Sequence, residues 1–159
     1  MLTTLDVALS QVGVKEETGQ NDGVPAQRYA RGDKVAWCAA FVLWCNERSD
    51  DVKIAGDLKE HYAMRSVTQM DLRLTARGWM LGKGQRPQPG DVIFFGNRGR
   101  SDVGVTGRHV GLVERVDGDH VHTVEGNYSN QVAKVRHRLD DKRITGFARL
   151  PTTSQLLQG

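Results

Sequence analysis

Residues 109–127 read HVGLVERVDGDHVHTVEGN, and this stretch is the basis for the architecture that we expect for the whole chain. Two runs rich in Val, His and Leu stand on either side of Asp117-Gly118-Asp119, which is a strong turn signal. The pattern predicts two antiparallel strands joined by a three-residue loop, with glycine in the left-handed position. We therefore expect a β-hairpin over this stretch.

The register of this hairpin would place polar side chains around His109. Side chains alternate between the two faces of a strand, so a three-residue loop sets Gly111 opposite Glu125 and His109 opposite Asn127. Glu125 and Asn127 would then flank the imidazole, accept its second N–H and fix its tautomer. A two-residue loop would turn Glu125 to the wrong face. The alternative interpretation of Glu125 and Asn127 is a polar strand end at the edge of a sheet. The opposite face is expected to be core, formed by Val110, Leu112, Val116 and Val124.

The segments outside the hairpin complete an α+β pattern. Apolar residues at helical spacing predict a helix within 2–12, a buried helix over 35–46 that begins near Trp37, and partial helix over 57–78. Pro89-Gly90-Asp91 predicts a turn, and further strands are expected over 92–95, 132–137 and 144–150, after a Gly- and Arg-rich loop over 96–107. Helices followed by an antiparallel sheet indicate one domain over 1–159, with its core from about 5 to 150 and a polar, frayed tail over 151–159.

Both cysteines fall in the predicted buried helix, and only one of them has a position that suits chemistry. Cys38 and Cys45 are two turns apart, or about 10 Å, which is too far for a disulfide. A helix that starts at Trp37 or Cys38 would put the Cys38 thiol at the positive end of the helix dipole, where the thiolate is stabilised. Position alone leaves a nucleophile and a small core residue equally open for Cys38. For Cys45, core packing is the interpretation.

Among the five histidines, His109 is the best candidate for a base, because it opens a strand after a flexible loop. His61 and His137 stand among charged residues and are interpreted as surface residues. His120 and His122 form a His-x-His pair whose spacing could bind metal, although exposed side chains are the favoured reading. A metal site that joins this pair to the two cysteines is the weakest hypothesis.

The charge balance argues against a nucleic-acid partner. The net charge is +3 with a sequence pI near 9.0, and the 22 basic residues are scattered among 19 acidic ones instead of forming a stripe. No apolar stretch has membrane-spanning length. The first residues lack both a basic leader and an apolar core, so no signal peptide is expected. We expect a monomer with no membrane partner, made in the cytoplasm and dependent on other factors to leave it.

Four motifs together resemble the CHAP domain family (cysteine, histidine-dependent amidohydrolases/peptidases), which are relatives of the NlpC/P60 peptidases on a papain-like fold. The motifs occur in the family's order, and the resemblance covers about 5–150. They are Ala36-Trp37-Cys38-Ala39-Ala40-Phe41-Val42, Pro89-Gly90-Asp91-Val92-Ile93-Phe94-Phe95, Arg108-His109-Val110-Gly111-Leu112-Val113-Glu114 and Thr123-Val124-Glu125-Gly126-Asn127.

The resemblance implies a role for each residue of the expected site. Cys38 would attack an amide carbonyl, His109 would act as base and then acid, and Glu125 and Asn127 would orient the imidazole. Backbone N–H groups at the helix start would hold the oxyanion. The 17–23 loop would border the substrate groove, with Glu17, Asn21 and Asp22 as expected substrate contacts, and Trp37 is expected to contact substrate as well.

No cofactor or metal is expected. Some family members carry an acidic calcium loop before the nucleophile, but residues 29–35 offer only Asp33 as a carboxylate, and calcium prefers six or more oxygen ligands.

The leading hypothesis is a peptidoglycan hydrolase that cuts an amide bond of the bacterial cell wall, as an endopeptidase or an N-acetylmuramoyl-L-alanine amidase. The resemblance suggests a phage endolysin that reaches the wall by holin-dependent release or by secretion. Three alternatives stay open: a secreted antibacterial amidase effector, an amidase acting on glutathione conjugates, and a non-catalytic wall-binding or phage structural component.

Overall fold

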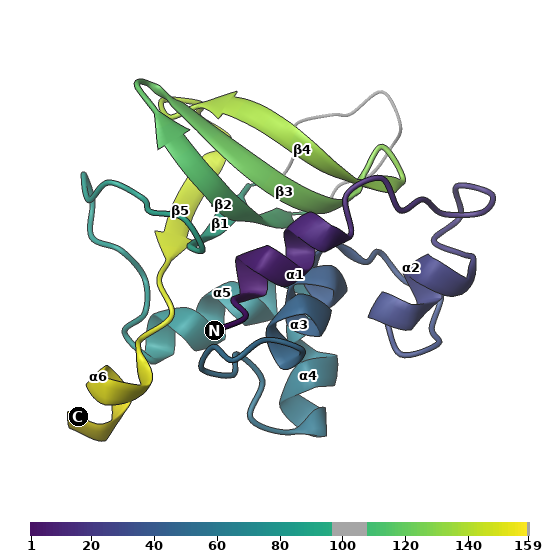
Figure 1. Cartoon of the computed structure of the whole chain (residues 1–159), viewed down its shortest axis with the longest axis horizontal. Coiled ribbons are helices and arrows are strands. Elements are labelled where there is room, and N and C mark those ends of the chain that lie inside the picture. The colour runs from purple at the N-terminus through teal and green to yellow at the C-terminus, as the bar shows by residue number, and fades with distance from the viewer. Residues whose placement is uncertain (97–107, 159) are drawn as a thin grey trace.

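The computed structural model describes residues 1–96 and 108–158, and within them five antiparallel strands form one sheet (Figure 1). The predicted Gly- and Arg-rich loop falls mostly on 97–107, outside the described residues. The strand order is β4-β3-β2-β1-β5, so the predicted hairpin β2–β3 lies at the middle of the sheet. The strands are β1 (Val92–Phe95), β2 (His109–Asp117), β3 (His120–Tyr128), β4 (Gln131–Arg138) and β5 (Ile144–Ala148).

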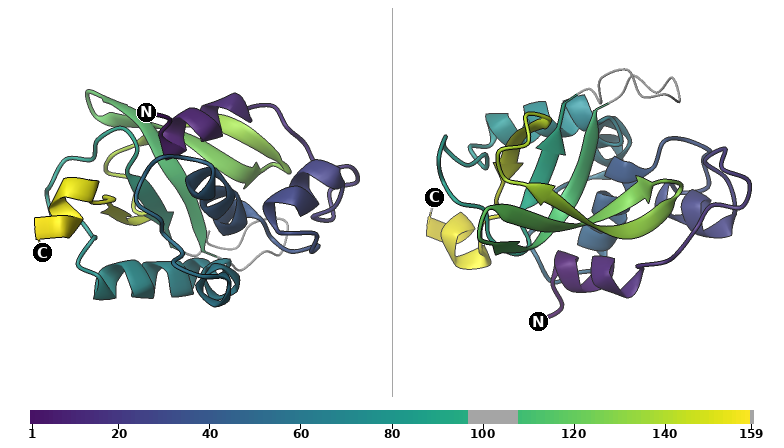
Figure 2. Two further views of the ribbon diagram at one scale, coloured as in Figure 1. Left: turned by 60° about the horizontal axis from the view of Figure 1, so that its bottom comes forward. Right: turned by 90° about the horizontal axis from the view of Figure 1, so that it is seen from above.

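Helices cover one face of this sheet, which confirms the predicted α+β arrangement. Helices α1 and α3 pack on each other and on β2 and β3, with α4 and α5 beyond them and α2 at the side (Figures 1 and 2). The expected frayed tail is wrong in part, because it contains a short exposed helix, α6. The helices described are α1 (Thr4–Ser10), α2 (Val24–Tyr29), α3 (Cys38–Glu47), α4 (Leu58–Met64), α5 (Val67–Ala76) and α6 (Thr153–Gln158).

Side-chain caps fix where several of these helices begin. Thr3 and Asp6 form a reciprocal capping box at the start of α1. The side chains of Asp57 and Ser66 accept from backbone N–H groups at the starts of α4 and α5. In the part of the chain that the structure describes, no helix is both long and apolar enough to cross a bilayer.

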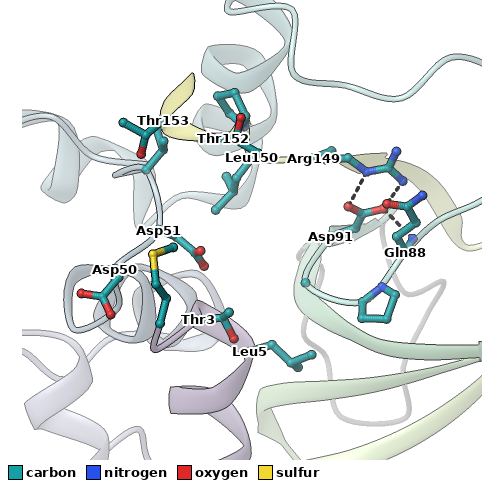
Figure 3. Close-up of a pocket in the computed structure, with 15 residues that line it drawn as sticks. Thr3, Leu5, Asp50, Asp51, Gln88, Asp91, Arg149, Leu150, Thr152 and Thr153 are labelled. Atoms are coloured by element: carbon teal, nitrogen blue, oxygen red, sulfur yellow. Dashed lines mark hydrogen bonds and ion pairs between the residues drawn. The ribbon is translucent and has the colours of Figure 1, made fainter. Parts of the chain in front are cut away.

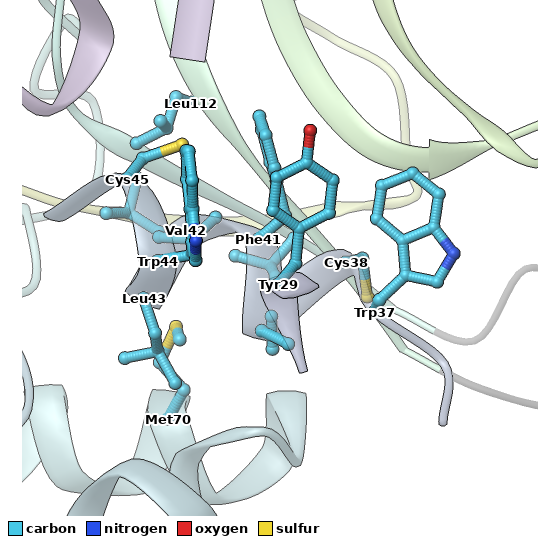
Figure 4. Packing of buried hydrophobic residues seen from close by; sticks show 14 of the residues in the cluster. Tyr29, Trp37, Cys38, Phe41, Val42, Leu43, Trp44, Cys45, Met70 and Leu112 are labelled. Atoms are coloured by element: carbon cyan, nitrogen blue, oxygen red, sulfur yellow. The ribbon is translucent and has the colours of Figure 1, made fainter. Parts of the chain in front are cut away.

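Apolar residues collect in two clusters, one on each face of the sheet. The larger one surrounds α3, whose residues from Cys38 to Asn46 are all buried (Figure 4). The predicted core residues Val110, Leu112 and Val124 belong to it. Val116 does not: it packs against the smaller cluster on the other face, and the path of β2 explains why.

The β2–β3 hairpin reaches the expected register by an unexpected route. Its loop has two residues, Gly118 and Asp119, so the predicted three-residue loop is wrong. One extra residue in β2, Glu114, forms a β-bulge that shifts the ladder by one, so that continuation of the ladder sets Gly111 opposite Glu125 as predicted. The bulge also moves Val116 to the face opposite the one expected. The defining pairs are Leu112–Val124, Val113–Thr123, Arg115–His122, Val116–Val121 and Asp117–His120.

Candidate active site

Helix α3 begins at Cys38, and its first turn is left open for chemistry. Among the described residues no side chain caps this end, whose N-cap is Trp37, so the N–H groups of the first turn keep their capacity to donate. Aromatic side chains hold this end in place. Trp37 stacks on Tyr29 at 5.4 Å between ring centroids, and Tyr29 meets Phe41 edge-on at 5.0 Å (Figure 4).

The Cys38 thiol hydrogen-bonds the imidazole of His109, which stands at the first position of β2. Burial of Cys38, which is 7% exposed, raises the pKa of its thiol, but the hydrogen bond and charge of His109 outweigh burial and lower the pKa overall. The backbone N–H groups of Val110 and Ala39 also stabilise the thiolate. Contacts with Cys38 and Glu125 overcome the burial of His109 and raise its pKa to about 9. The lowered pKa of Cys38 and the raised pKa of His109 both favour the thiolate–imidazolium form of the pair.

Glu125 completes this line of side chains from the centre of β3. Its carboxylate is fully buried and accepts from His109 Nε2 at Oε1, over 2.7 Å. Burial alone would raise the pKa of Glu125, but the hydrogen bonds from His109 and His137 lower it to about 2. Because a carboxylate can only accept, Nε2 of His109 carries a proton, and the nitrogen left to face the thiol is Nδ1.

Glycine at position 111 is what gives the Glu125 side chain its space. A Cβ at Gly111 would lie 2.7 Å from Cγ of Glu125, far inside van der Waals contact. Gly126 follows Glu125 on β3 and leaves space for α3, because a Cβ there would lie 2.6 Å from the Phe41 side chain. The two glycines let β2, β3 and α3 come close enough for Cys38, His109 and Glu125 to meet.

Asn127 contacts the N-terminal loop. Its backbone takes a left-handed conformation with φ 56°, and its Nδ2 donates to Oδ1 of Asn21 over 3.4 Å. Its expected role beside His109 stays a prediction. Asn21 was expected to contact substrate, and the structure puts this half-buried residue next to Asn127, near the end of β3.

Glu16 is a residue that the sequence analysis missed, and it ties this loop to the nucleophile helix. Its Oε1 accepts from the indole N–H of Trp37 over 2.5 Å, and its Oε2 accepts from the backbone N–H of Asn21 over 3.0 Å. The structure does not support Trp37 as a substrate contact, because the side chain is fully buried and spends its only donor on Glu16.

The other two loop residues expected to contact substrate differ in exposure. Glu17 is exposed, and its backbone N–H closes the loop by donating to the carbonyl of Asp22. The Asp22 carboxylate accepts from both the backbone and the hydroxyl of Thr18, and these hydrogen bonds lower its pKa. Asp22 therefore shapes the loop, and the substrate roles of Glu17 and Asp22 stay predictions.

Two histidines interpreted as surface residues are buried, so that interpretation was wrong. His137 on β4 contacts Oε2 of Glu125 over 2.6 Å. His61 on α4 is 1% exposed and contacts Oε1 of Glu47, also over 2.6 Å. Charged neighbours in sequence were misleading, because in each case the partner carboxylate comes from the preceding strand or helix. His120 and His122 are partly exposed, next to Asp119 and Asp117 respectively.

The remaining polar candidates have structural partners. Cys45 is a free, buried thiol whose pKa burial raises, so it is inert core as interpreted. Asp33, the only carboxylate of the stretch before the nucleophile, pairs with Arg65 over 2.8 Å. Within the described residues no three His, Cys, Asp or Glu side chains converge in a way that could hold a metal ion. The expectation of no metal stays a prediction.

Phe95, which pairs with His109, is the last residue of β1. A pocket of about 390 Å³ lies at the opposite end of this strand (Figure 3). The Pro-Gly-Asp motif forms part of its wall. Asp91 is 2% exposed and holds a two-pronged ion pair with Arg149, with both distances 2.9 Å. This ion pair therefore links the residue just before β1 to the residue just after β5. Its lining contains neither a cysteine nor a histidine, so we do not place the chemistry there.

Comparison with solved structures finds a similar fold. The crystal structure of Ly7917 superimposes with a TM-score of 0.59 and 20% identity, over 93% of this chain and 61% of Ly7917. The crystal structure of Ly7917 with the hydrolyzing product of MDP gives 0.47 and 21%, over 93% of this chain and 62% of the other. This chain thus spans less than two thirds of the length of Ly7917. A search of curated proteins gave no match.

The sequence also matches the CHAP domain over residues 30–127, which is more than half of the chain. The matched segment contains Cys38, His109 and Glu125, the three side chains that the structure brings into contact. The chain belongs to the CHAP domain family, the cysteine- and histidine-dependent amidohydrolases and peptidases.

Proposed function

We propose that this protein is a peptidoglycan hydrolase that cleaves an amide bond of the bacterial cell wall by cysteine nucleophilic catalysis. The observation that carries the proposal is the unbroken line from Cys38 through His109 to the buried Glu125, in a chain of the CHAP family. A nucleophile, a base and an orienting carboxylate in contact are what acyl transfer requires. A non-catalytic wall-binding component would need none of the three.

The arrangement supports a two-step reaction. The Cys38 thiolate attacks the amide carbonyl carbon, and N–H groups at the start of α3 stabilise the oxyanion that forms. The His109 imidazolium then gives its Nδ1 proton to the leaving amine, so the C–N bond breaks and a thioester remains on Cys38. In the second step His109 takes a proton from water, and the hydroxide attacks the thioester. The carboxylic acid leaves and the thiolate–imidazolium pair is restored.

Within this function we propose an endolysin-type enzyme that acts as a monomer, either an endopeptidase or an N-acetylmuramoyl-L-alanine amidase. The support is the resemblance of the four motifs. The mild positive charge of +3 also suits an anionic wall polymer. The proposal includes synthesis in the cytoplasm and access to the wall only after release.

Digestion of purified peptidoglycan by the wild-type protein and by Cys38→Ala tests the proposal. We expect loss of turbidity with the wild type and none with the variant, whose fold is checked by circular dichroism. Mass spectrometry of the products identifies the bond: new amino groups within stem peptides indicate an endopeptidase, and free lactyl groups indicate the amidase. Equal clearance by a folded Cys38→Ala would overturn the Cys38 mechanism.

Expression in a Gram-negative host tests the route. We expect growth without lysis when the protein stays in the cytoplasm, and lysis when a holin is produced with it. Lysis without any such helper would contradict dependence on release.

A further inference from the structure

We propose that His137 is a positioning residue for the Cys38–His109 pair, and that it acts through Oε2 of Glu125, whereas His109 contacts Oε1. This inference rests on the proposed cysteine chemistry and extends it to β4, two strands away from His109. None of the four family-like motifs contains His137.

The two histidines approach the same carboxylate from opposite sides. His109 reaches Oε1 of Glu125 over 2.7 Å, and His137 reaches Oε2 over 2.6 Å. All three side chains are buried, at 6% exposed for His109, 0% for Glu125 and 8% for His137. Both contacts are as short as strong, charge-assisted hydrogen bonds. Glu125 therefore serves as a bridge whose two ends are both held by imidazole.

The second oxygen needs donors because the Glu125 carboxylate is fully buried. A buried carboxylate is costly unless its lone pairs are satisfied. The Thr123 hydroxyl, on the same strand, also donates to Oε2. His137 and Thr123 thus keep Glu125 ionised and stop it from rotating away from His109. An ionised Glu125 in turn favours the imidazolium, and the imidazolium favours the Cys38 thiolate.

The surroundings of the two histidines include a shared aromatic wall and a charged turn. The Phe95 ring, on β1, lies 5.6 Å from the His109 ring and 4.8 Å from the His137 ring, centroid to centroid. Asp141, in the turn after β4, interacts electrostatically with His137 and is paired with Arg143 over 2.7 Å. Arg143 also interacts electrostatically with Glu125. Cys38 is the further titratable group that faces His109 from α3.

The experiment compares His137→Leu, which removes the donor, with His137→Gln, whose amide N–H can replace it. The readout is the rate at which iodoacetamide alkylates Cys38, measured from pH 4 to 10 by mass spectrometry of the Cys38 peptide. We expect His137→Leu to move the midpoint of thiolate formation up by about one pH unit, with an activity loss on the order of tenfold. His137→Gln should restore most of both.

The matched control is His61→Leu, which removes another buried histidine that contacts a glutamate over 2.6 Å, away from this site. We expect this variant to lose stability but to keep the wild-type alkylation curve. A shift as large as that of His137→Leu would overturn the proposal, because any buried histidine would then have the same effect. An unshifted curve in a folded His137→Leu would overturn it as well.

If His137→Leu does not fold, the proposal can still be tested on the wild-type protein. Nitrogen NMR of the imidazoles should show a proton on Nε2 of His137, because a carboxylate can only accept. A neutral His137 with its proton on Nδ1 alone would refute the bridge. The alkylation assay needs no wall polymer, so its result is independent of the substrate. A reactive Cys38 without cleavage of peptidoglycan would overturn the proposed function and leave the role of His137 standing.

Discussion

Replacement of Gly111 by alanine should disable the site while leaving the fold in place. The new Cβ would lie 2.7 Å from Cγ of Glu125, whereas ordinary contact begins at 3.4 Å. One of the two must therefore move by about 0.7 Å. If Glu125 moves, its contact with His109, now 2.7 Å, stretches to about 3.4 Å, beyond the range of a good hydrogen bond.

This displacement sets the expected magnitudes. Misplacement of a catalytic group by about 1 Å costs on the order of 100-fold in rate, so kcat/KM should fall roughly 10- to 100-fold. Overpacking by one methyl group costs about 1–3 kcal/mol of unfolding free energy. For a chain of this length that lowers Tm by roughly 2–12 °C. The protein should thus remain folded at 25 °C with an impaired site.

The assay combines peptidoglycan clearance, alkylation of Cys38 near pH 6 and thermal unfolding. Gly82→Ala is the matched control, because a Cβ there meets nothing within 4 Å and its backbone is not left-handed. We expect the control to behave as wild type in all three measurements. Wild-type alkylation and clearance by Gly111→Ala would refute the reasoning, because Glu125 would then not need the space above residue 111.

Three further predictions concern pH and the N-terminal loop. Folding lowers the pKa of Glu125 from 4.5 to about 2, so its contribution to stability is full above pH 4.5 and is lost as pH falls to 2. Folding raises the pKa of His109 from 6.5 to about 9, so its contribution is full below pH 6.5 and is lost as pH rises through 9. Thermal unfolding across pH should show both losses, and Glu125→Gln should lack the acidic one. Hydrolysis should decline near pH 9, when His109 loses its proton, while alkylation of Cys38 stays fast, since the thiolate persists; parallel declines would contradict this assignment. Glu16→Gln weakens the link between the loop and the nucleophile helix, so we expect a several-fold rise in KM with a smaller change in kcat, and an unchanged KM would mean that the loop does not position substrate.

Local patterns in the sequence were enough to predict the main elements of the fold. Alternation of apolar residues identified β2 and β3, and the position of Cys38 at a helix start followed from the apolar run after it. Helix α2 was missed, because its six residues are too few to show a helical period. Its N-terminal half carries Pro25, which is compatible with a helix start but also with a loop.

Contacts between distant segments were the part that local patterns could not predict. His137 and Glu16 matter through partners 12 and 21 residues away, Glu125 and Trp37. The charged residues around His137 in the sequence are typical of an exposed strand, and only its alignment with β3 shows that the imidazole turns inward. The same limit applies to Trp37, which was expected to contact substrate although its indole belongs to the core.

The bulge at Glu114 leads to a last prediction, on the number of residues between Gly111 and Glu125. This number decides on which face of the sheet Glu125 lies. A regular ladder with a two-residue loop would misplace Glu125 by one residue, and the extra residue in β2 corrects this. Deletion of Glu114 alone should therefore be tolerated, because the ladder becomes regular and Gly111 still faces Glu125. The ion pair lost with it, to Lys134 over 3.2 Å, is at the surface and worth about 0–1 kcal/mol.

Deletion of both Glu114 and Arg115 should abolish activity instead, because a regular ladder then turns Glu125 to the face opposite His109. We expect the single deletion to keep clearance of peptidoglycan within a few-fold of wild type, and the double deletion to lose alkylation of Cys38 at pH 6. A folded but inactive single deletion would show that the bulge shapes the site beyond its effect on register. An active double deletion would show that the position of Glu125 does not depend on the pairing of β2 with β3.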